Sequence, residues 1–246
     1  MLLLAALACT LSCMGASNEE PVRVYAAASL GPALTPILEA WSQDSGHPTA
    51  LSTASTPRIV SQLQSGAPAD LVLTADTLWM QFLVDGGLVQ SPVHLLSNTL
   101  VLVVAAGSPV QTLTDLQGPI ALAGEQVPAG RYAEQALRAE GLWANLSPQA
   151  RRGDNVRTVL AWVSRGEVSA AVVYGSDAHN NPKVRVLHRF PEHAHEPIAI
   201  WAATTPQAQA PAQGLLSVLA EPPGQARFIA AGFTGVGSVR TEADAP

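Results

Sequence analysis

Lysine is almost absent from this sequence of 246 residues, and cationic side chains are few in general. Lys183 is the single lysine among 13 Lys and Arg residues, whereas Asp and Glu number 19, so the formal net charge is −6. A protein that binds the phosphate backbone of DNA or RNA needs a basic face, which this composition does not provide. The charge balance therefore argues against nucleic acid as a partner. It argues equally against an anionic ligand held by a cluster of cations.

Cysteine is just as scarce, and both cysteines lie near the N-terminus. Cys9 and Cys13 fall within an apolar run that begins at Leu2, and no charge occurs before Glu19. The run is roughly half of the ~20 residues that a membrane span needs, and it lies where the apolar region of a secretory leader lies. We therefore predict a leader over residues 1–16. The mature protein then has no disulfide framework and no cysteine metal site.

Two ways of processing this leader remain open. Small residues precede each cysteine, as in a bacterial lipobox, in which the cysteine becomes the lipidated first residue. Cys13 is the preferred lipidation candidate over Cys9 because it leaves the longer apolar stretch ahead of it. The alternative is ordinary cleavage after Ala16. Both predict a periplasmic or extracytoplasmic protein, and the first adds a lipid anchor to the membrane.

The rest of the chain is typical of a globular α/β protein. Hydrophobic residues make up 48% and charged residues 13%, against the ~25% charged residues of average soluble domains. The length fits one large or two medium domains. Short apolar or β-branched runs alternate with amphipathic stretches, which is the pattern of α/β folds. The predicted strands are 22–27, 49–55, 71–74, 100–105, 120–123, 170–173, 184–188 and 198–203.

Helices are predicted between these strands. Apolar residues from Leu30 to Trp41 recur with helical spacing, so they form one face of a first helix. Pro36 interrupts it, and either the helix bends there or Thr35 caps a new helix that begins at Pro36. A glycine follows several of the other helices as a stop signal. The predicted helices after the first are 57–65, 77–84, 130–140, 156–165, 207–219 and 224–231.

Four strand-to-helix turns are the most informative feature. The turns that open predicted helices are Ala28-Ser29, Ser55-Thr56-Pro57, Val127-Pro128-Ala129-Gly130 and Asp154-Asn155-Val156. The first N–H groups of a helix have no intrahelical partner, and the helix dipole is positive there, so such turns bind anions without Lys or Arg. In an open α/β sheet these turns gather at the carboxyl ends of the strands. One turn alone is ordinarily a helix cap. Only the convergence of several would make a site.

Motifs spread over residues 22–233 resemble the family of periplasmic molybdate-binding proteins of ABC-type molybdate importers, which are bacterial extracellular solute-binding proteins. No motif is specific alone, but their order and spacing together are. They are VYAAASL at 24–30, GAPADL at 66–71, TAD at 74–76, WM at 79–80, VPAGRYA at 127–133, NVR at 155–157, VYGSDA at 173–178 and FPE at 190–192 with His195.

The resemblance implies a fold and a ligand site. The fold is the bilobal periplasmic-binding-protein fold of type II, with two doubly wound α/β lobes joined by a hinge of two crossings near 98–104 and 198–203. Residues 22–100 plus 202–240 form lobe I, and 101–201 form lobe II. The oxyanion is held by the hydroxyl and N–H groups of Ser29 and Thr56. The backbone N–H groups of Ala129 and Val156 and the phenol of Tyr174 complete the site.

The sequence departs from the family at Thr56-Pro57, where the family has Ser followed by a small residue. Thr56 keeps a hydroxyl and an N–H, but its β-branch fixes the rotamer and Pro57 removes a neighbouring donor. A second departure, Gly31-Pro32 with Pro36 in the first helix, affects the angle at which Ser29 approaches the ligand.

We expect an exported binding protein that captures molybdate and tungstate and delivers it to an ABC-type permease of the inner membrane. We expect a monomer with no enzymatic activity, no cofactor and no metal beyond the oxyanion. The alternatives are a binder of another tetrahedral oxyanion such as sulfate, or a sensing or enzymatic domain on the same scaffold.

Three other clusters contain residue types that occur in metal or catalytic sites. His193 and His195, flanked by glutamates, could suggest a metal site, but we interpret them as part of a solvated loop. Ser176, Asp177 and His179 do not form a catalytic triad. Asp70 and Asp76 are interpreted as structural, with Asp76 the N-cap of the helix at 77.

Overall fold

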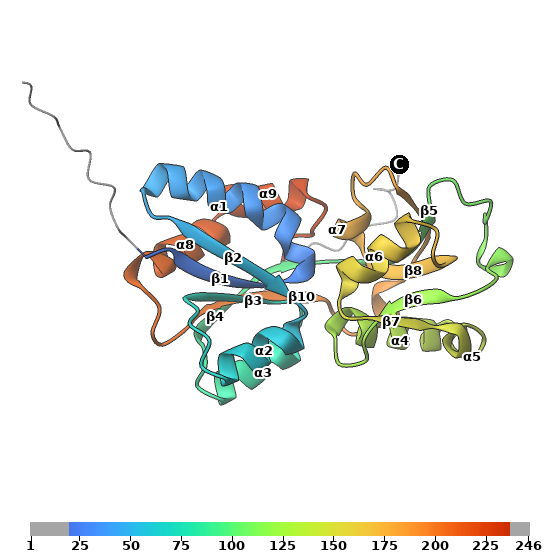
Figure 1. Ribbon diagram of the computed structural model, residues 1–246, viewed down its shortest axis with the longest axis horizontal. Helices are drawn as coiled ribbons and strands as arrows, with labels where there is room; N and C mark the ends of the chain where they lie inside the picture. The colour runs from blue at the N-terminus through green and yellow to red at the C-terminus, as the bar shows by residue number, and fades with distance from the viewer. Residues whose placement is uncertain (1–19, 237–246) are drawn as a thin grey trace, which may run out of the picture.

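The computed structural model describes residues 20–236 and shows two α/β lobes side by side, each built on a five-stranded sheet (Figure 1). This confirms the predicted bilobal α/β class. The predicted leader, with Cys9 and Cys13, lies outside the described residues. Within the described range, no helix combines the length and hydropathy required to span a membrane.

The sheet of lobe I has the strand order β2-β1-β3-β10-β4. β1 (Val22–Ala27), β2 (Thr49–Ala54) and β3 (Leu71–Thr74) are parallel, and β10 (Ala199–Thr204) and β4 (Gln90–Ser97) complete the sheet with antiparallel pairs. α1 (Gly31–Ser45), α8 (Ala210–Ala220) and α9 (Pro222–Ala230) cover one face (Figure 1). α2 (Thr56–Gln64) and α3 (Thr77–Asp85) cover the other.

Lobe II repeats this arrangement with the order β7-β6-β8-β5-β9. β6 (Ile120–Ala123), β7 (Arg151–Gly153) and β8 (Ala170–Tyr174) are parallel, while β5 (Leu100–Ala105) and β9 (Val184–Arg189) are antiparallel to their neighbours. α4 (Pro128–Ala139) and α5 (Trp143–Leu146) lie on one face, and α6 (Val156–Ser164) and α7 (Gly175–Ala178) on the other. Short 3₁₀ turns are η1 (Ala28–Leu30), η2 (Leu113–Asp115), η3 (Ser147–Gln149) and η4 (Glu192–Ala194).

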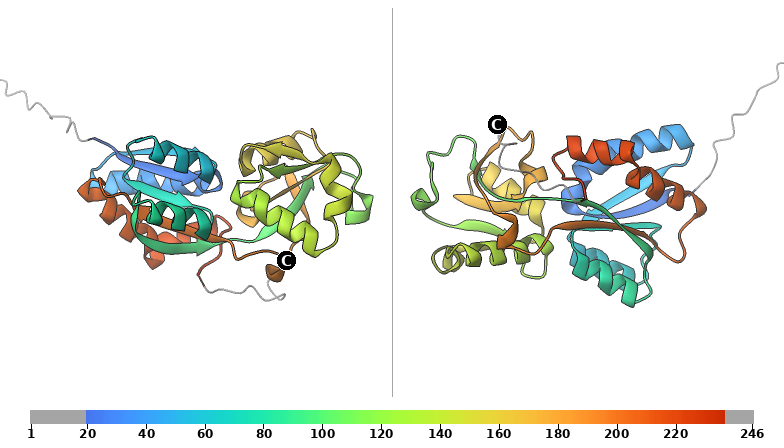
Figure 2. Two further views of the ribbon diagram at one scale, coloured as in Figure 1. Left: turned by 90° about the horizontal axis from the view of Figure 1, so that it is seen from below. Right: turned by 180° about the vertical axis from the view of Figure 1, so that it is seen from behind.

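Within the described range of the chain, two segments connect the lobes (Figure 2). The first passes from β4 to β5 through Asn98 and Thr99, and the second runs from β9 to β10 over residues 190–198. The lobe boundaries expected at 100/101 and 201/202 therefore fall inside strands β5 and β10. β5 is buried along almost its whole length, as expected for a strand covered on both faces.

Two strands were not predicted from the sequence, β4 and β7. Both lie at the edge of their sheet. β4 contains Pro92 and is largely exposed at its beginning, and β7 has only three residues. Edge strands need no apolar alternation and tolerate proline, so the sequence carries no strand pattern there.

The first helix is a single helix that includes Pro36. The alternative of a new helix capped by Thr35 is wrong, since the Thr35 hydroxyl donates to the Gly31 carbonyl at 2.9 Å within the same helix. Pro36 is exposed, so its ring does not disturb the buried face formed by Leu34, Ile37 and Leu38.

Candidate functional site

The structure brings all five predicted site residues together around one small cavity between the lobes. Ser29, Thr56, Ala129, Val156 and Tyr174 all line it. The other lining residues are small, apolar or amide-bearing: Ala27, Ala28, Ser55, Ala75, Val127, Pro128 and Asn155.

The topology explains this convergence. In each lobe the parallel strands end at the side that faces the other lobe, and each strand leads into a helix or turn there (Figure 1). β1 and β2 place Ser29 and Thr56 on one side of the cavity. β6 and β7 place Ala129 and Val156 on the other, and Tyr174 ends β8. The cavity therefore lies at the carboxyl ends of both sheets, where open α/β sheets bind ligands.

Three hydroxyl groups in this cavity have no hydrogen-bond partner. Among the described residues, the buried side-chain atoms without a partner are Ser29 Oγ, Thr56 Oγ1, Tyr174 OH and Arg131 Nε. An unsatisfied buried polar group costs about 1–3 kcal/mol. Three such hydroxyls, contributed by both lobes to one cavity, indicate a site for a ligand that accepts hydrogen bonds.

Backbone N–H groups supply further donors. The N-cap residues of α2 and α4, Ser55 and Val127, make no side-chain cap. Asn155 caps α6 through the N–H of Thr158, at 3.0 Å, and not through that of Val156. The N–H groups of Thr56, Ala129 and Val156 occupy the first turn of their helices, where no intrahelical acceptor exists. The positive ends of three helices therefore lie at the cavity.

Gly130 fixes the position of the Ala129 amide. A Cβ at this position would come within 2.2 Å of the Gly124 carbonyl oxygen and 2.4 Å of that of Ala123. Only glycine allows the beginning of α4 to lie this close to the end of β6. Glycine is thus required here for close backbone approach.

The cavity is neutral and small. None of the described residues that line it carries a charge. Burial raises the pKa of the Tyr174 phenol well above its ordinary value, so the hydroxyl keeps its proton and remains a donor. The cavity measures about 10 Å³, close to the volume of a single water-sized sphere. A space of this size holds neither a sugar nor a peptide.

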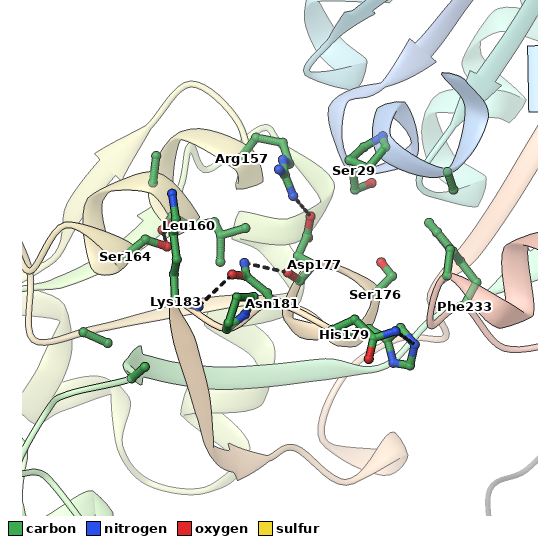
Figure 3. Close-up of a pocket in the computed structure, with 18 of the residues that line it drawn as sticks. Ser29, Arg157, Leu160, Ser164, Ser176, Asp177, His179, Asn181, Lys183 and Phe233 are labelled. Carbon is green, nitrogen blue, oxygen red and sulfur yellow. Dashed lines mark hydrogen bonds and ion pairs between the residues drawn. The ribbon is translucent and has the colours of Figure 1, made fainter. Parts of the chain in front are cut away.

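A wider groove of about 890 Å³ lies beside the cavity, and Ser29 lines both (Figure 3). In this groove Arg157 contacts the buried carboxylate of Asp177 at 3.3 Å, and the other oxygen of Asp177 accepts the N–H of Tyr174 at 3.3 Å. Burial raises the pKa of Asp177 to about 6, against the opposing effect of Arg157. The pair joins Arg157 at the beginning of α6 to Asp177 on α7, directly after β8.

An ion pair that sequence reasoning missed joins the two lobes on the other side of the cavity. Asp76 accepts the N–H of Trp79 at 2.9 Å, which confirms its predicted N-cap role. Its second oxygen lies 2.8 Å from Nη2 of Arg131 on α4. The Trp79 indole also donates to the Gln126 carbonyl at 3.2 Å. No sequence signal links Asp76 and Arg131, because the pair depends on how the lobes meet.

The other residues considered as candidate sites in the sequence make contacts within the fold. Asp70 accepts the backbone N–H groups of Arg23 at 2.8 Å and Gln209 at 3.0 Å, consistent with a structural role. His195 donates through Nδ1 to the Glu196 carbonyl at 2.7 Å, and burial lowers its pKa. Within residues 20–236 no group of three or more His, Cys, Asp or Glu side chains could hold a metal ion.

Comparisons with known protein families and curated proteins find similar sequences. The family model described as bacterial extracellular solute-binding protein matches residues 22–234. The molybdate-binding protein ModA of Escherichia coli is 36% identical over 195 residues, which cover 74% of this chain and 76% of ModA.

Two solved structures share the fold. The periplasmic molybdate-binding protein of Azotobacter vinelandii matches with a TM-score of 0.77 at 21% identity, over 87% of this chain and 98% of that one. The sulfate-binding protein SubI of Mycobacterium tuberculosis matches with a TM-score of 0.72 at 15% identity, over 88% of this chain and 87% of that one.

Proposed function

Because this chain belongs to the bacterial extracellular solute-binding protein family, we propose that it captures molybdate between its lobes and delivers it to an ABC-type permease. The observation that carries the proposal is the set of three unpartnered hydroxyls in a cavity without charge. The family consists of solute-binding proteins, so the chain is a binding protein and not an enzyme. It binds its solute as a ligand and has no cofactor.

The donor set matches the chemistry of an unprotonated dianion. Molybdate has four acceptor oxygens and no proton, so a site made only of donors satisfies it. Ser29 and Thr56 each offer a hydroxyl and an N–H, Ala129 and Val156 offer N–H groups, and Tyr174 offers its phenol. Hydrogenphosphate carries a hydroxyl that would face another donor. That mismatch costs about 1–3 kcal/mol, or tenfold to hundredfold in affinity.

Size separates the remaining oxyanions. Sulfate is unprotonated like molybdate, but its tetrahedron is smaller, so donors on rigid helix ends cannot all close onto it. Tungstate has nearly the size of molybdate and is included in the proposal. Sulfate binding is the second candidate, favoured by the fold that the chain shares with a sulfate-binding protein. That similarity concerns the fold alone.

Delivery depends on closure of the lobes. The oxyanion takes donors from both lobes, so it stabilises the arrangement in which they meet, and the permease recognises that closed form. The two crossings between the lobes act as the hinge. Export through the leader, with Cys13 as the lipid attachment site, places the protein on the outer face of the inner membrane.

Calorimetric titration of the leaderless protein tests the proposal. Molybdate and tungstate are expected to bind with micromolar to nanomolar affinity, about −8 to −12 kcal/mol. Sulfate and phosphate are expected to bind at least tenfold more weakly. Tight binding of sulfate, or heat from none of the four anions, would overturn the assignment.

A further inference from the structure

The ion pair between Asp76 and Arg131 bridges the lobes beside the cavity but touches none of the proposed ligand donors. Asp76 lies at the end of β3, next to Ala75, which lines the cavity. Arg131 lies on α4, two positions after Ala129, and its side chain is 25% exposed. The Asp76 side chain is completely buried. Each partner belongs to a different lobe, so the contact exists only while the lobes meet.

We propose that Arg131 and Asp76 form a latch that stabilises the closed arrangement of the lobes and keeps the charge of Asp76 neutralised beside the anion site. Both are positioning residues for the proposed oxyanion capture, and in that sense the inference rests on the proposed function. The latch acts on the lobes whether or not an anion is bound.

The electrostatic surroundings make Arg131 the critical partner. In this arrangement of the lobes the Asp76 side chain is completely buried, which costs free energy while it is charged. A buried carboxylate left without its cation is strongly unfavourable. Arg131 removes that cost on closure. The only other carboxylate within ion-pair distance of Arg131 among the described residues is Glu196, at 3.6 Å and 55% exposed.

The charge of Asp76 also acts at the cavity. It raises the pKa of the Tyr174 phenol and Arg131 lowers it, so the fields of both side chains reach the hydroxyl that we assign to the ligand. An unpaired, negatively charged Asp76 would repel a dianion bound in the neighbouring cavity. With Arg131 in place, the pair contributes nearly no net charge. The neutral character of the site therefore depends on a residue outside it.

The experiment compares four variants of the leaderless protein. Arg131→Gln leaves Asp76 buried and unpaired, so it is expected to weaken molybdate binding about tenfold or more. Asp76→Asn keeps an N-cap for α3 and removes the charge, so a smaller loss is expected. The double variant Asp76→Asn with Arg131→Gln has no unpaired charge and is expected to bind more tightly than Arg131→Gln alone. Arg138→Gln, on the exposed side of the same helix, is the matched control with unchanged affinity.

Small-angle scattering without added anion gives a second readout that a purely structural role would not move. Arg131→Gln is expected to have a larger radius of gyration than the wild type and to become compact when molybdate is added. Arg131→Lys, which keeps the charge, is expected to recover part of the compaction. Thermal unfolding checks that each variant folds. If Arg131→Gln does not fold, the scattering and affinity of Asp76→Asn test the latch instead.

The outcomes separate the two proposals. The latch would be overturned if the two single variants lost equal affinity for molybdate and these losses added in the double variant. It would also be overturned if Arg131→Gln had the affinity and the radius of gyration of the wild type. If the wild type binds no oxyanion, the proposed function fails, while the scattering of the anion-free variants still decides whether the latch exists.

Discussion

The two lobes share one strand pattern but end their third parallel strand in different ways. In lobe I, β3 leads to Asp76, a carboxylate that caps α3 and pairs with Arg131 across the interface. In lobe II, β8 ends at Tyr174, whose uncharged hydroxyl faces the cavity without a partner. A buried carboxylate follows the strand in both lobes, but Asp76 pairs across the interface, whereas Asp177 pairs with Arg157 inside lobe II and leaves the last strand residue, Tyr174, to face the cavity. The difference shows that charges lie beside the site, in pairs, and neutral donors lie in it.

The largest effect on molybdate binding is expected when a negative charge is introduced into the cavity itself. Thr56→Asp places a carboxylate at the first position of α2, where a helix favours an acidic residue, so the protein is expected to fold. The carboxylate would repel a dianion and take its donors, which lowers molybdate affinity by about a thousandfold or more. Calorimetry measures the loss. Thr56→Ser is the control and should bind like the wild type, whereas molybdate binding by the Asp variant would refute the neutral site.

Removing a neutral donor has a smaller effect. Tyr174→Phe deletes one unpartnered hydroxyl and leaves the packing of the ring in place. Molybdate affinity is expected to fall by about 1–3 kcal/mol, since one hydrogen bond to a charged ligand is lost. The melting temperature without anion should not fall. Tyr132→Phe, another buried tyrosine of lobe II that does not line the cavity, should leave affinity unchanged.

The second buried carboxylate of the interface region, Asp177, predicts a pH dependence of stability. Burial raises its pKa from 3.8 to about 6, so between these values the folded protein binds more protons than the unfolded chain. The free energy of unfolding therefore decreases as pH rises from about 4 to about 6, by an amount on the order of 1–3 kcal/mol. Denaturant unfolding of wild type and Asp177→Asn at several pH values isolates this contribution. Parallel pH profiles for the two proteins would contradict this prediction, because they would mean that the pKa of Asp177 does not differ between the folded and unfolded states.

The smallest effect is expected where the charges are exposed. Glu196 lies 3.6 Å from Arg131 and is 55% exposed, so solvent screens the pair. Glu196→Gln should change molybdate affinity by less than about fivefold, because exposed pairs contribute roughly 0–1 kcal/mol. A loss as large as that of Asp76→Asn would mean that Arg131 is shared between two acids and that the latch has a third member.

The sequence predicts most of what is local. The beginnings of α3 and α6 follow from the capping residues Asp76 and Asn155, and that of α2 from Pro57 in its first turn, so the turns that carry Thr56, Asp76 and Val156 could be located. The resemblance to a known family added Tyr174, which no local signal marks. The ligand roles of these residues stay a prediction, although the structure places them around one cavity.

What the sequence does not predict depends on distant contacts. Asp76 was correctly interpreted as a helix cap, but its pairing with Arg131 joins residues of different lobes and has no signature in either segment. The edge strands β4 and β7 have no apolar pattern because one side of each lies free of the sheet. Pro36 was compatible with two helices, and only the exposed position of its ring explains why one helix accommodates it.

The position of β10 has a consequence for the order of folding. β10 lies between β3 and β4, and both of its neighbours precede it by about a hundred residues or more along the chain. The first hundred residues therefore contain β3 and β4 but not the strand that joins them, and lobe I cannot close its sheet until the chain is made as far as Thr204. The lobe that begins the sequence is the last to be completed. Such long-range pairing is slow, so the chain remains open for longer than a sheet built from consecutive strands would.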